Sequence, residues 1–590
     1  MKRFFSLTIS LSSLASLIAL SGCAAVGNGT EATVLAEVNN IATGSLPTRV
    51  AVAEADGKPA LLYSTKDDRV AFQVGDRRQL IDETARVRGG GGFFQLRPQD
   101  GKLHAMWWSH QSGKNIYFTS SADGGQRFTP VSMVNDENGV LPPFTLSTGA
   151  DGMLGMTYQD ERLGGYQAYF NRSTDNGLNW ARPDQRLDIA QGAQTTNVHE
   201  PQMVQLGNVW VSAWTDIVRG SGATAYRILV RRTEDGGQRW SAPEVVHSAE
   251  SQISSLTVKA EDGHVVAAAD QLNVGIVAFA SLDAGRSWRA AGPLPGSEKV
   301  SNSGIDLAVN GSLAHLVWMH ERQGEKIRIM RASLDVVQAK WLVNAAQRLD
   351  VKQIENTRSL SPSLITTPKG AVLAAWVDYR DIRPNIYVSA SYDQGQSWSL
   401  PQAVLAPGST SIGWPQLVPW RDQVALGYEV YPTDRIMEGK FVLRLLPTGE
   451  KVQGLPGLPK LRQVSEAERR AKLEQRVKSL WDNRIAGNYE PTFEMFDFAY
   501  KASTPKKAYL DNVGVITYLS ASVNELVING NEADVKMKLR YEVQPTILPS
   551  TGKKITLPAA DVESPTKWVW VGNDWFLMFT PSFEPPQLKY

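Results

Sequence analysis

The pattern of hydrophobic and polar residues divides the chain into two parts. Between Val34 and Pro447, short apolar runs alternate with turn residues, which predicts many short strands. A capping box at Ser465 to Glu468 then opens a different pattern, in which apolar residues recur at helical spacing. That stripe consists of Leu473, Val477, Leu480, Trp481 and Ile485. The pattern predicts a large all-β domain followed by a small α+β domain.

Turns of one kind recur through the first part. Each has Ser or Thr, then Asp two positions later, Gly two positions after that, and an aromatic residue three further on. The Asp side chain can cap the backbone of its own turn, and the Gly can adopt the positive φ that a tight hairpin needs. Such recurrence is typical of a repeat protein. The five segments are Ser121–Phe128, Ser173–Trp180, Thr233–Trp240, Ser281–Trp288 and Ser391–Trp398.

The strand upstream of each turn ends in an aromatic or apolar residue. In most units a polar residue follows two positions later. Two such units lack the turn, at Tyr63/Thr65 and Tyr428/Val430, and a further one keeps only a remnant at Ser333 to Asp335. The spacing of about fifty residues is that of one four-stranded propeller blade. We predict eight blades, with seven or six as alternatives, and expect Val34 to Val38 to supply the outer strand of the last blade.

The repeat also predicts which residues share a face. In an antiparallel blade the recurring turns follow the third strand, so the residues that end the second strand lie on the opposite face. There we predict a ligand-binding ring of aromatic, acidic and basic side chains, a mixture that suits sugars. The alternative is that these Asp and Arg residues form structural ion pairs and the Trp residues pack between sheets. The candidates are Asp160, Arg162, Trp214, Asp216, Trp318, His320, Arg322, Trp376, Asp378 and Arg380.

The recurring turn resembles the Asp box of the sialidase-like, or BNR-repeat, β-propeller superfamily. Hydrolases of that family use a Tyr nucleophile, a partner Glu, an acid/base Asp and three Arg residues that hold the substrate carboxylate. His199-Glu200-Pro201-Gln202 resembles the family segment that carries the Glu, which implies a catalytic role for Glu200. Tyr428 is then the candidate nucleophile, and Asp67 or Asp68 the candidate acid.

Two departures from the family pattern shape the functional prediction. The family places an Arg near the end of the Glu segment, where this chain has Trp214-Thr215-Asp216, and Thr48 to Ala51 matches the family's Arg-Ile-Pro signal weakly. We therefore expect a propeller that binds a glycan or a partner protein without catalysis. The alternative is an exo-acting glycoside hydrolase of sialidase type. The alternative to a catalytic role for Glu200 is a structural one, in which its carboxylate accepts a hydrogen bond from a neighbouring blade.

The N-terminus carries a targeting signal. Lys2 and Arg3 precede an apolar run that ends in Leu20-Ser21-Gly22-Cys23, which is typical of a secretory signal peptide over residues 1–22. It resembles the bacterial lipoprotein class, which implies lipidation of Cys23, a tether over 23–33 and, from Ala24, an outer-membrane destination in the cell envelope. The alternatives are an ordinary signal peptide and an N-terminal membrane anchor.

After the propeller, at 34–447, residues 448–464 are rich in Pro and Gly and are expected to be a linker. Residues 465–590 are expected to form a second domain, with a second, aromatic-rich helix over Pro491 to Tyr500 and strands that end at Phe579. Leu480-Trp481-Asp482 and the residues that follow to Asp497 resemble the nuclear-transport-factor-2-like or SnoaL-like cone. The aromatic residues at Trp481, Tyr489, Phe493, Trp568 and Trp575 are expected to be core, which favours an accessory or docking role.

Charge and composition limit the kinds of partner and cofactor that the sequence predicts. There are 61 Lys and Arg against 60 Asp and Glu, so a glycan or an envelope protein is expected and a nucleic acid is not. The single Cys excludes an internal disulfide, and the seven His show no ligand spacing, so no metal or cofactor is expected. Contact with a membrane is expected through the lipid anchor alone.

Overall fold

The computed structural model describes the two parts of the chain with gaps. The described ranges of the first part are 33–41, 50–81, 93–110, 113–189, 197–219, 224–322, 325–350, 358–380, 384–404, 411–431 and 439–446. Those of the second part are 464–496, 506–511, 513, 516–529, 532–543, 546–547, 554–555, 558–571 and 574–578. The predicted signal peptide, Cys23, most of the tether and linker, and the predicted hairpin at Gly572-Asn573 lie outside the described residues.

Within the described part of 34–446, eight antiparallel sheets follow one another along the chain. The first four are β2 (Val50–Ala55), β3 (Lys58–Ser64), β4 (Val70–Val74), β5 (Arg77–Leu80); β6 (Phe94–Gln99), β7 (Lys102–Ser109), β8 (Asn115–Ser121), β9 (Ser132–Met133); β10 (Val140–Thr148), β11 (Leu154–Asp160), β12 (Gln167–Ser173), β13 (Gln185–Arg186); and β14 (Asn197–Leu206), β15 (Val209–Arg219), β16 (Thr224–Thr233), β17 (Glu244–Ala249).

The other four sheets repeat this plan. They are β18 (Ile253–Glu261), β19 (His264–Gln271), β20 (Gly275–Ser281), β21 (Arg289–Pro293); β22 (Ser301–Asn310), β23 (Leu313–Glu321), β24 (Arg328–Asp335), β25 (Lys340–Trp341) with β26 (Gln347–Arg348); β27 (Ser359–Thr366), β28 (Val372–Asp378), β29 (Asn385–Ser391), β30 (Gln402–Ala403); and β31 (Ser411–Trp420), β32 (Gln423–Tyr431), β33 (Gly439–Leu446) with β1 (Val34–Ile41).

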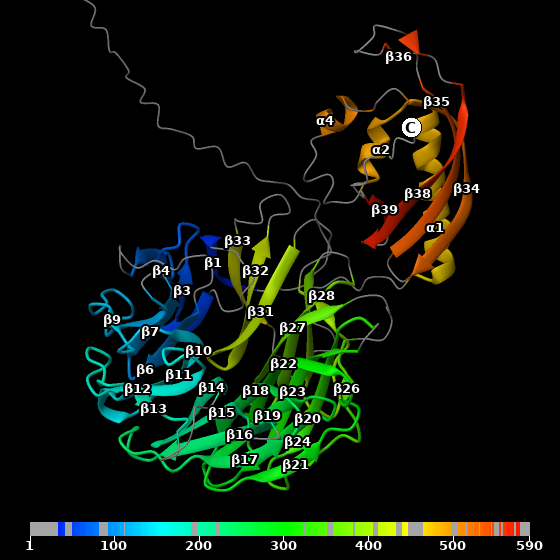
Figure 1. Ribbon diagram of the computed structural model, residues 1–590. Coiled ribbons are helices and arrows are strands. Elements are labelled where there is room, and N and C mark those ends of the chain that lie inside the picture. Colours follow the sequence, from blue (N-terminus) through cyan, green and yellow to red (C-terminus); the bar gives the residue numbers. More distant parts are fainter. Residues whose placement is uncertain are drawn as a thin grey trace, which may run out of the picture.

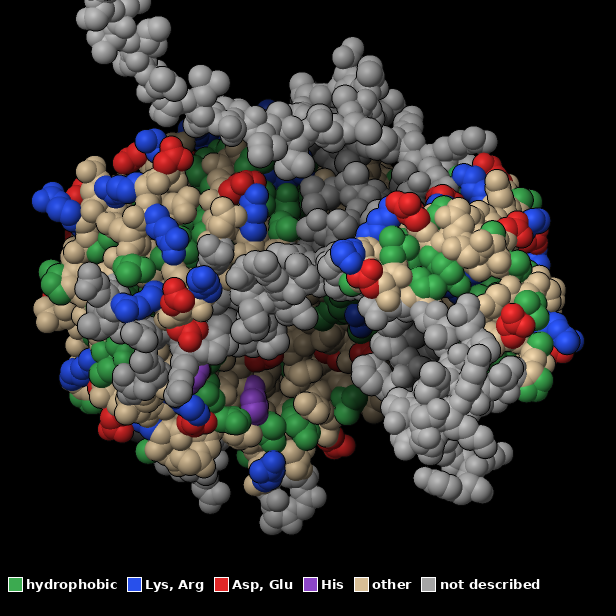
Figure 2. All heavy atoms as spheres, turned by 90° about the horizontal axis from the view of Figure 1, so that it is seen from above, with side chains coloured by type: hydrophobic (Ala, Val, Ile, Leu, Met, Phe, Trp, Pro, Cys, Tyr) green, Lys and Arg blue, Asp and Glu red, His purple; other side chains and the backbone are tan. Residues whose placement is uncertain are grey.

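The last sheet joins the two ends of this part. β1 pairs antiparallel with β33, with Val38 opposite Phe441, so the predicted outer strand from the N-terminal end is confirmed. Figure 1 shows the sheets following one another from blue to yellow around one body, with β33 beside β1. Seen from above, this body is hollowed on one face (Figure 2).

Each sheet shares a hydrophobic core with the next one. One cluster packs Phe118 of the second sheet against Tyr158 of the third, and the remaining neighbouring pairs have equivalent clusters. The last sheet closes on the first in the same way, because Phe441 packs with Leu61 in a single cluster. Gln416 Nε2 also donates to the Val50 carbonyl across this junction at 3.1 Å. Middle strands such as β11 and β28 are buried throughout because a neighbouring sheet covers each of their faces.

The recurring turns follow the third strands, as predicted. In the first, Ser121 Oγ donates to Asp123 Oδ1 at 2.9 Å, and the Gly125 and Arg127 amides donate to Ser121 and Asp123 at 2.8 Å. Gly125 has a φ of 80°, and the equivalent glycines of the other four turns have φ between 80° and 83°. These turns are self-contained, which explains how their sequence can be recognised locally.

The second part contains α1 (Glu466–Ile485), α2 (Glu490–Glu494) and α4 (Lys506–Asp511), a sheet of β34 (Ile516–Asn529), β35 (Glu532–Val543), β38 (Ala560–Val571) and β39 (Asp574–Met578), and a small pair of β36 (Thr546–Ile547) and β37 (Lys554–Ile555). Ser465 Oγ caps α1 by accepting the Glu468 amide at 3.2 Å. The helix buries its predicted stripe against the sheet, except for Ile485, which is 38% exposed at the helix end.

Most of the aromatic residues expected in the second core are found there. Trp481, Phe493, Trp568 and Trp575 are buried, while Tyr489 is partly exposed. Among the helices that the structure describes, none is long and apolar enough to cross a membrane.

Candidate functional site

Antiparallel pairing places three kinds of strand end at one edge of each sheet. These are the start of the first strand, the end of the second and the start of the third, and we call this edge the rim. The residues predicted from the sequence belong to it: Asp160, Asp216, His320 and Asp378 lie at or near the ends of β11, β15, β23 and β28. The recurring Asp turns lie at the opposite edge, so the predicted separation of the two faces is found.

A backbone bulge recurs where the first strands reach the rim. In the fourth to eighth sheets, two residues of the first strand lie opposite one residue of the second. The first bulged residue has a positive φ in every case, between 51° and 58°. Bulges with a left-handed first residue bend a strand and redirect its side chains. These five residues are Glu200, Ser255, Gly304, Ser361 and Trp414.

The bulges explain the aromatic residues of the second strands. Glu200 and Pro201 lie opposite Trp214, and the equivalent partners in three other sheets are Trp318, Trp376 and Tyr428. The three Trp side chains have no exposed surface. Trp318 Nε1 donates to Asn302 at 2.9 Å and Trp376 Nε1 donates to Asp378 at 3.1 Å. In this conformation these indoles pack between sheets, and a ligand on the surface does not reach them.

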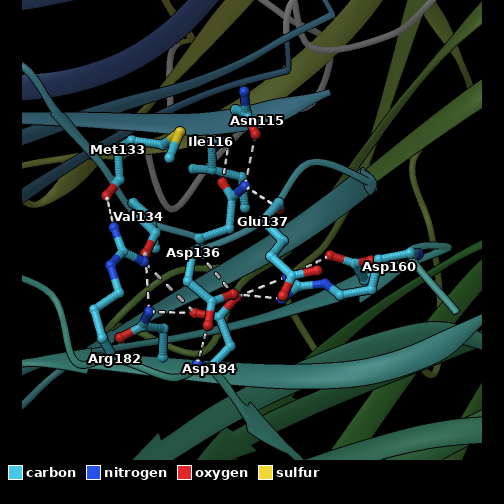
Figure 3. A network of polar contacts seen from close by, with 12 residues as sticks. Asn115, Ile116, Met133, Val134, Asp136, Glu137, Asp160, Arg182 and Asp184 are labelled. Carbon is cyan, nitrogen blue, oxygen red and sulfur yellow. Dashed lines mark hydrogen bonds and ion pairs between the residues drawn. The ribbon is translucent and has the colours of Figure 1, made fainter. Parts of the chain in front are cut away.

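Arg162 lies at the centre of an ion-pair network between the second and third sheets. Its guanidinium lies 2.7 Å from Asp160 and 2.7 Å from Asp184, and it also pairs with Asp136. The amides of Asp136 and Asp184 donate to each other's carboxylates at 3.0 and 2.8 Å. Figure 3 shows the side chains of Asp136 and Asp184 facing one another, with Asp160 beyond them. The Arg162 side chain is only 6% exposed, so the network is interior.

Three carboxylates around one guanidinium give an excess of negative charge. Burial, together with the neighbouring Asp136, raises the pKa of Asp184 to about 6. Burial opposes ionisation of Asp136 as well, but hydrogen bonds from Asp184 and Arg162 outweigh it and lower the Asp136 pKa. The same carboxylates raise the pKa of Arg162 against the effect of its burial.

The other predicted charged residues also have partners within the fold. Arg227 pairs with Asp216 at 2.6 Å, and Arg380 pairs with Asp378 at 2.6 Å while lying 4.1 Å from the centre of the Tyr387 ring. His320 Nδ1 lies 3.2 Å from Asn302 Oδ1, and burial lowers its pKa. Arg322 is different, because its side chain is 55% exposed and its contact with Glu325 is 3.6 Å long.

Glu200 connects two first strands. Its Oε2 accepts the Leu256 amide of β18 at 2.8 Å, and burial raises the carboxyl pKa against the effect of that hydrogen bond. Gln202 of the same segment accepts the Val258 amide at 3.1 Å. Trp414-Pro415-Gln416 takes the equivalent place in β31, where Gln416 reaches the next first strand. The Glu-Pro-Gln segment is therefore one instance of a structural repeat.

Tyr428 and Glu200 belong to different sheets, which are not neighbours in the order of the chain. It is buried in β32, and burial raises its pKa while Arg444 opposes the rise. Three sheets separate the sheet of β14 from that of β32, and no hydrogen bond joins Glu200 to Tyr428 in the described part of the chain. Asp67 and Asp68 lie in the turn from β3 to β4, at the rim.

Partly exposed aromatic residues at the rim escaped the sequence reasoning. Tyr166 lies edge-on to His199 with ring centres 5.3 Å apart, and Arg358 lies 4.2 Å from the centre of the Tyr379 ring. Trp414 is the fourth of these aromatic residues. The resemblance of Trp414-Pro415-Gln416 to Glu200-Pro201-Gln202 was the available signal, and it is a weak one because X-Pro-Gln also occurs at Arg97, Leu400 and Pro585. Across the residues that the structure describes, no cluster of His, Cys, Asp and Glu could hold a metal ion.

One family profile matches within this part. Residues 151–348 are similar to the profile described as "BNR repeat-like domain", which covers less than half of the chain. No curated protein matches the chain.

Several solved structures resemble the chain at low identity. A mutant of NanB sialidase from Streptococcus pneumoniae is 8% identical, with 69% of this chain and 94% of that chain covered and a TM-score of 0.33. A mutant α-L-arabinofuranosidase from Fusarium graminearum is 14% identical, covering 52% and 93%, with a TM-score of 0.32. A polysaccharide lyase described as an ulvan lyase is 12% identical, covering 71% and 96%, with a TM-score of 0.42.

Proposed function

We propose that residues 34–447 form a sialidase-like propeller of eight blades that binds a glycan at its rim without hydrolysing it. The eight sheets with shared cores, closed by Phe441 against Leu61, support the blade number. The BNR repeat-like match over 151–348 supports the family. The N-terminal segment supports a lipoprotein that is anchored at Cys23 in the cell envelope, at the outer membrane.

The observation that carries the absence of hydrolysis is that Glu200 and the guanidinium groups of the buried candidate sites, Arg322 excepted, already have partners within the fold. Hydrolysis of a sialoside needs guanidinium groups that are free to hold the substrate carboxylate. Here Arg162, Arg227 and Arg380 are paired with carboxylates of the fold. Glu200 accepts a backbone amide of the neighbouring sheet, and Tyr428 is buried in the eighth sheet, with three sheets between the two in chain order.

The partly exposed aromatic residues of the rim support a glycan as the ligand. Aromatic rings bind the apolar faces of sugars, while nearby polar groups fix their hydroxyls. Tyr166, His199, Tyr379 and Trp414 supply such rings at the same edge of their sheets. An envelope protein is the alternative partner, and the same surface would receive it.

Two measurements on the purified chain test this proposal. We expect retention on an array of immobilised oligosaccharides and no release of fluorophore from sialosides or from other aryl glycosides. Turnover that disappears in Glu200→Gln would establish the alternative, an exo-acting glycoside hydrolase, for which the raised pKa of Glu200 is the favouring observation. A chain that is neither retained nor active would refute the glycan proposal and leave the envelope protein.

The remaining parts are proposed to serve the propeller. We expect Cys23→Ala to move the protein from the membrane fraction to the soluble fraction of the cell, and unchanged fractionation would refute the lipid anchor. For residues 465–590 we propose a SnoaL-like accessory domain, since Trp481, Trp568 and Trp575 fill its interior as core residues. Deletion of that domain is expected to leave retention on the oligosaccharide array intact.

A further inference from the structure

Trp414 stands apart from the other residues at the five equivalent bulges. Two of them are Ser and one is Gly, whereas Trp414 carries the largest side chain in the left-handed conformation, at φ 53°. A bulky residue rarely adopts this conformation, because its Cβ meets the neighbouring backbone. Such strain is maintained only when the surroundings enforce it, and it concentrates at functional sites.

The indole of Trp414 also differs from the other indoles of the rim. Trp214, Trp318 and Trp376 have no exposed surface, whereas Trp414 is only partly buried. Trp108 is also partly buried, but its Nε1 donates to the Val140 carbonyl at 2.8 Å. The described residues offer no hydrogen-bond partner to Trp414 Nε1, which is not enclosed either. Its N–H group is therefore free to donate to a ligand, and its side chain belongs to a residue that keeps part of its surface exposed.

The backbone around Trp414 is held firmly. Gln416, two residues later, donates to the Val50 carbonyl of β2 at 3.1 Å, and the Leu417 amide donates to Ser363 of β27 at 3.0 Å. β31 is thereby fixed to the strands on both sides. Pro415 restricts the backbone further. A rigid aromatic side chain costs little conformational entropy when it binds a ligand.

We infer that Trp414 is the stacking platform of the rim, on which the apolar face of a sugar ring lies while the indole N–H donates to a ring substituent. The inference rests on the proposed glycan binding and names the residue that provides it. The bulge at the start of β31 presents the ring, just as the equivalent bulge at the start of β14 turns Glu200 toward Leu256. Because stacking uses an uncharged ring face, it selects for sugar geometry and not for an acidic group.

The test compares retention of four chains on immobilised neutral, uronic-acid and sulfated oligosaccharides. The chains are the native one, Trp414→Asn, Trp414→Phe and Ser361→Asn. Asn tolerates the left-handed conformation, so Trp414→Asn removes the ring without adding strain. Ser361→Asn introduces the same residue at the equivalent bulge of β27, where no ring is removed, and is the matched control. Thermal unfolding reports whether each variant remains folded.

We expect the affinity of Trp414→Asn to fall about tenfold or more, that of Trp414→Phe by about threefold or less, and that of Ser361→Asn to remain unchanged. The melting temperature of Trp414→Asn should equal or exceed that of the native chain, because the strain is relieved. If the native chain is retained and Trp414→Asn binds with unchanged affinity, this inference alone is overturned. It is also overturned if Trp414→Asn loses stability in proportion to its loss of affinity. Failure of the native chain to bind any of the oligosaccharides would overturn the proposed function and the inference together.

Discussion

The interior network around Arg162 yields the sharpest prediction about stability. Replacing Arg162 with Met keeps an unbranched apolar stem but leaves Asp136, Asp160 and Asp184 without their shared guanidinium. The carboxyl groups of Asp160 and Asp184 have no exposed surface, so water cannot compensate for the loss. Removing one partner of a buried ion pair typically costs about 3–5 kcal/mol, since an unpaired charge remains inside.

The size of the effect on unfolding temperature follows from the size of the domain. At about 2.1 cal/mol/K per residue, a domain of about 400 residues has an unfolding entropy of roughly 0.8 kcal/mol/K. A loss of about 3–5 kcal/mol therefore lowers the melting temperature by about 4–6 °C at pH 7. Arg162 also lies 4.4 Å from the centre of the Tyr169 ring, and the loss of that contact adds to the change.

Thermal unfolding followed by circular dichroism and Trp fluorescence measures this loss. Arg322→Met is the matched control, because Arg322 is 55% exposed and its loss should cost less than about 1 kcal/mol. The deficit of Arg162→Met should shrink as the pH falls from 7 to 5, since protonation removes the uncompensated charge. Adding Asp184→Asn should restore part of the stability for the same reason. Equal melting temperatures for Arg162→Met and Arg322→Met would refute the reasoning.

Three further predictions concern single groups. The Asp184 pKa of about 6 lies above the usual value of 3.8, so the stability from its protonated form is lost as the pH rises from about 4 to 6; Asp184→Asn should flatten that part of the stability profile. Gly177→Ala meets the Phe118 ring at φ 83° and should cost about 2–4 kcal/mol, whereas Gly292→Ala, at φ 75° in open space, should cost about 1 kcal/mol. Equal losses would contradict the role of the ring. Ser465→Ala should destabilise the second domain by about 1 kcal/mol, measured by urea unfolding of that domain, because the α1 cap is lost.

Local chemistry explains which features the sequence could predict. The Asp turns were recognisable because Ser121, Asp123 and Gly125 bond to each other within a few residues. The pairing of β1 with β33 was predictable for a different reason, since the last repeat lacked one strand and the N-terminus offered one. The capping box at Ser465 is equally local. Each of these features depends on residues close in sequence or on a simple count of strands.

The rim was harder to predict because its contacts join residues that are distant in sequence. The aromatic and acidic residues at the strand ends were placed on the correct edge, but nothing local says that Trp376 is buried or that Arg162 meets Asp136 and Asp184. The bulges are equally hidden, because the sequence shows no glycine at Glu200 or Trp414 to signal a positive φ. Glu200 and Trp414 share the X-Pro-Gln pattern, but three other segments of the sequence carry it as well, so the pattern alone does not identify a bulge.

A repeat protein requires that a motif be compared with its equivalents before it is assigned chemistry. Glu200-Pro201-Gln202 suggests a catalytic segment when taken alone, yet Trp414-Pro415-Gln416 follows the same path and also reaches the next first strand. What the two segments share belongs to the fold, because it serves both sheets in the same way. Only the departures can be specific to a ligand, and the largest departure is the partly exposed Trp414. Function in this ring is therefore to be sought where one sheet differs from the others.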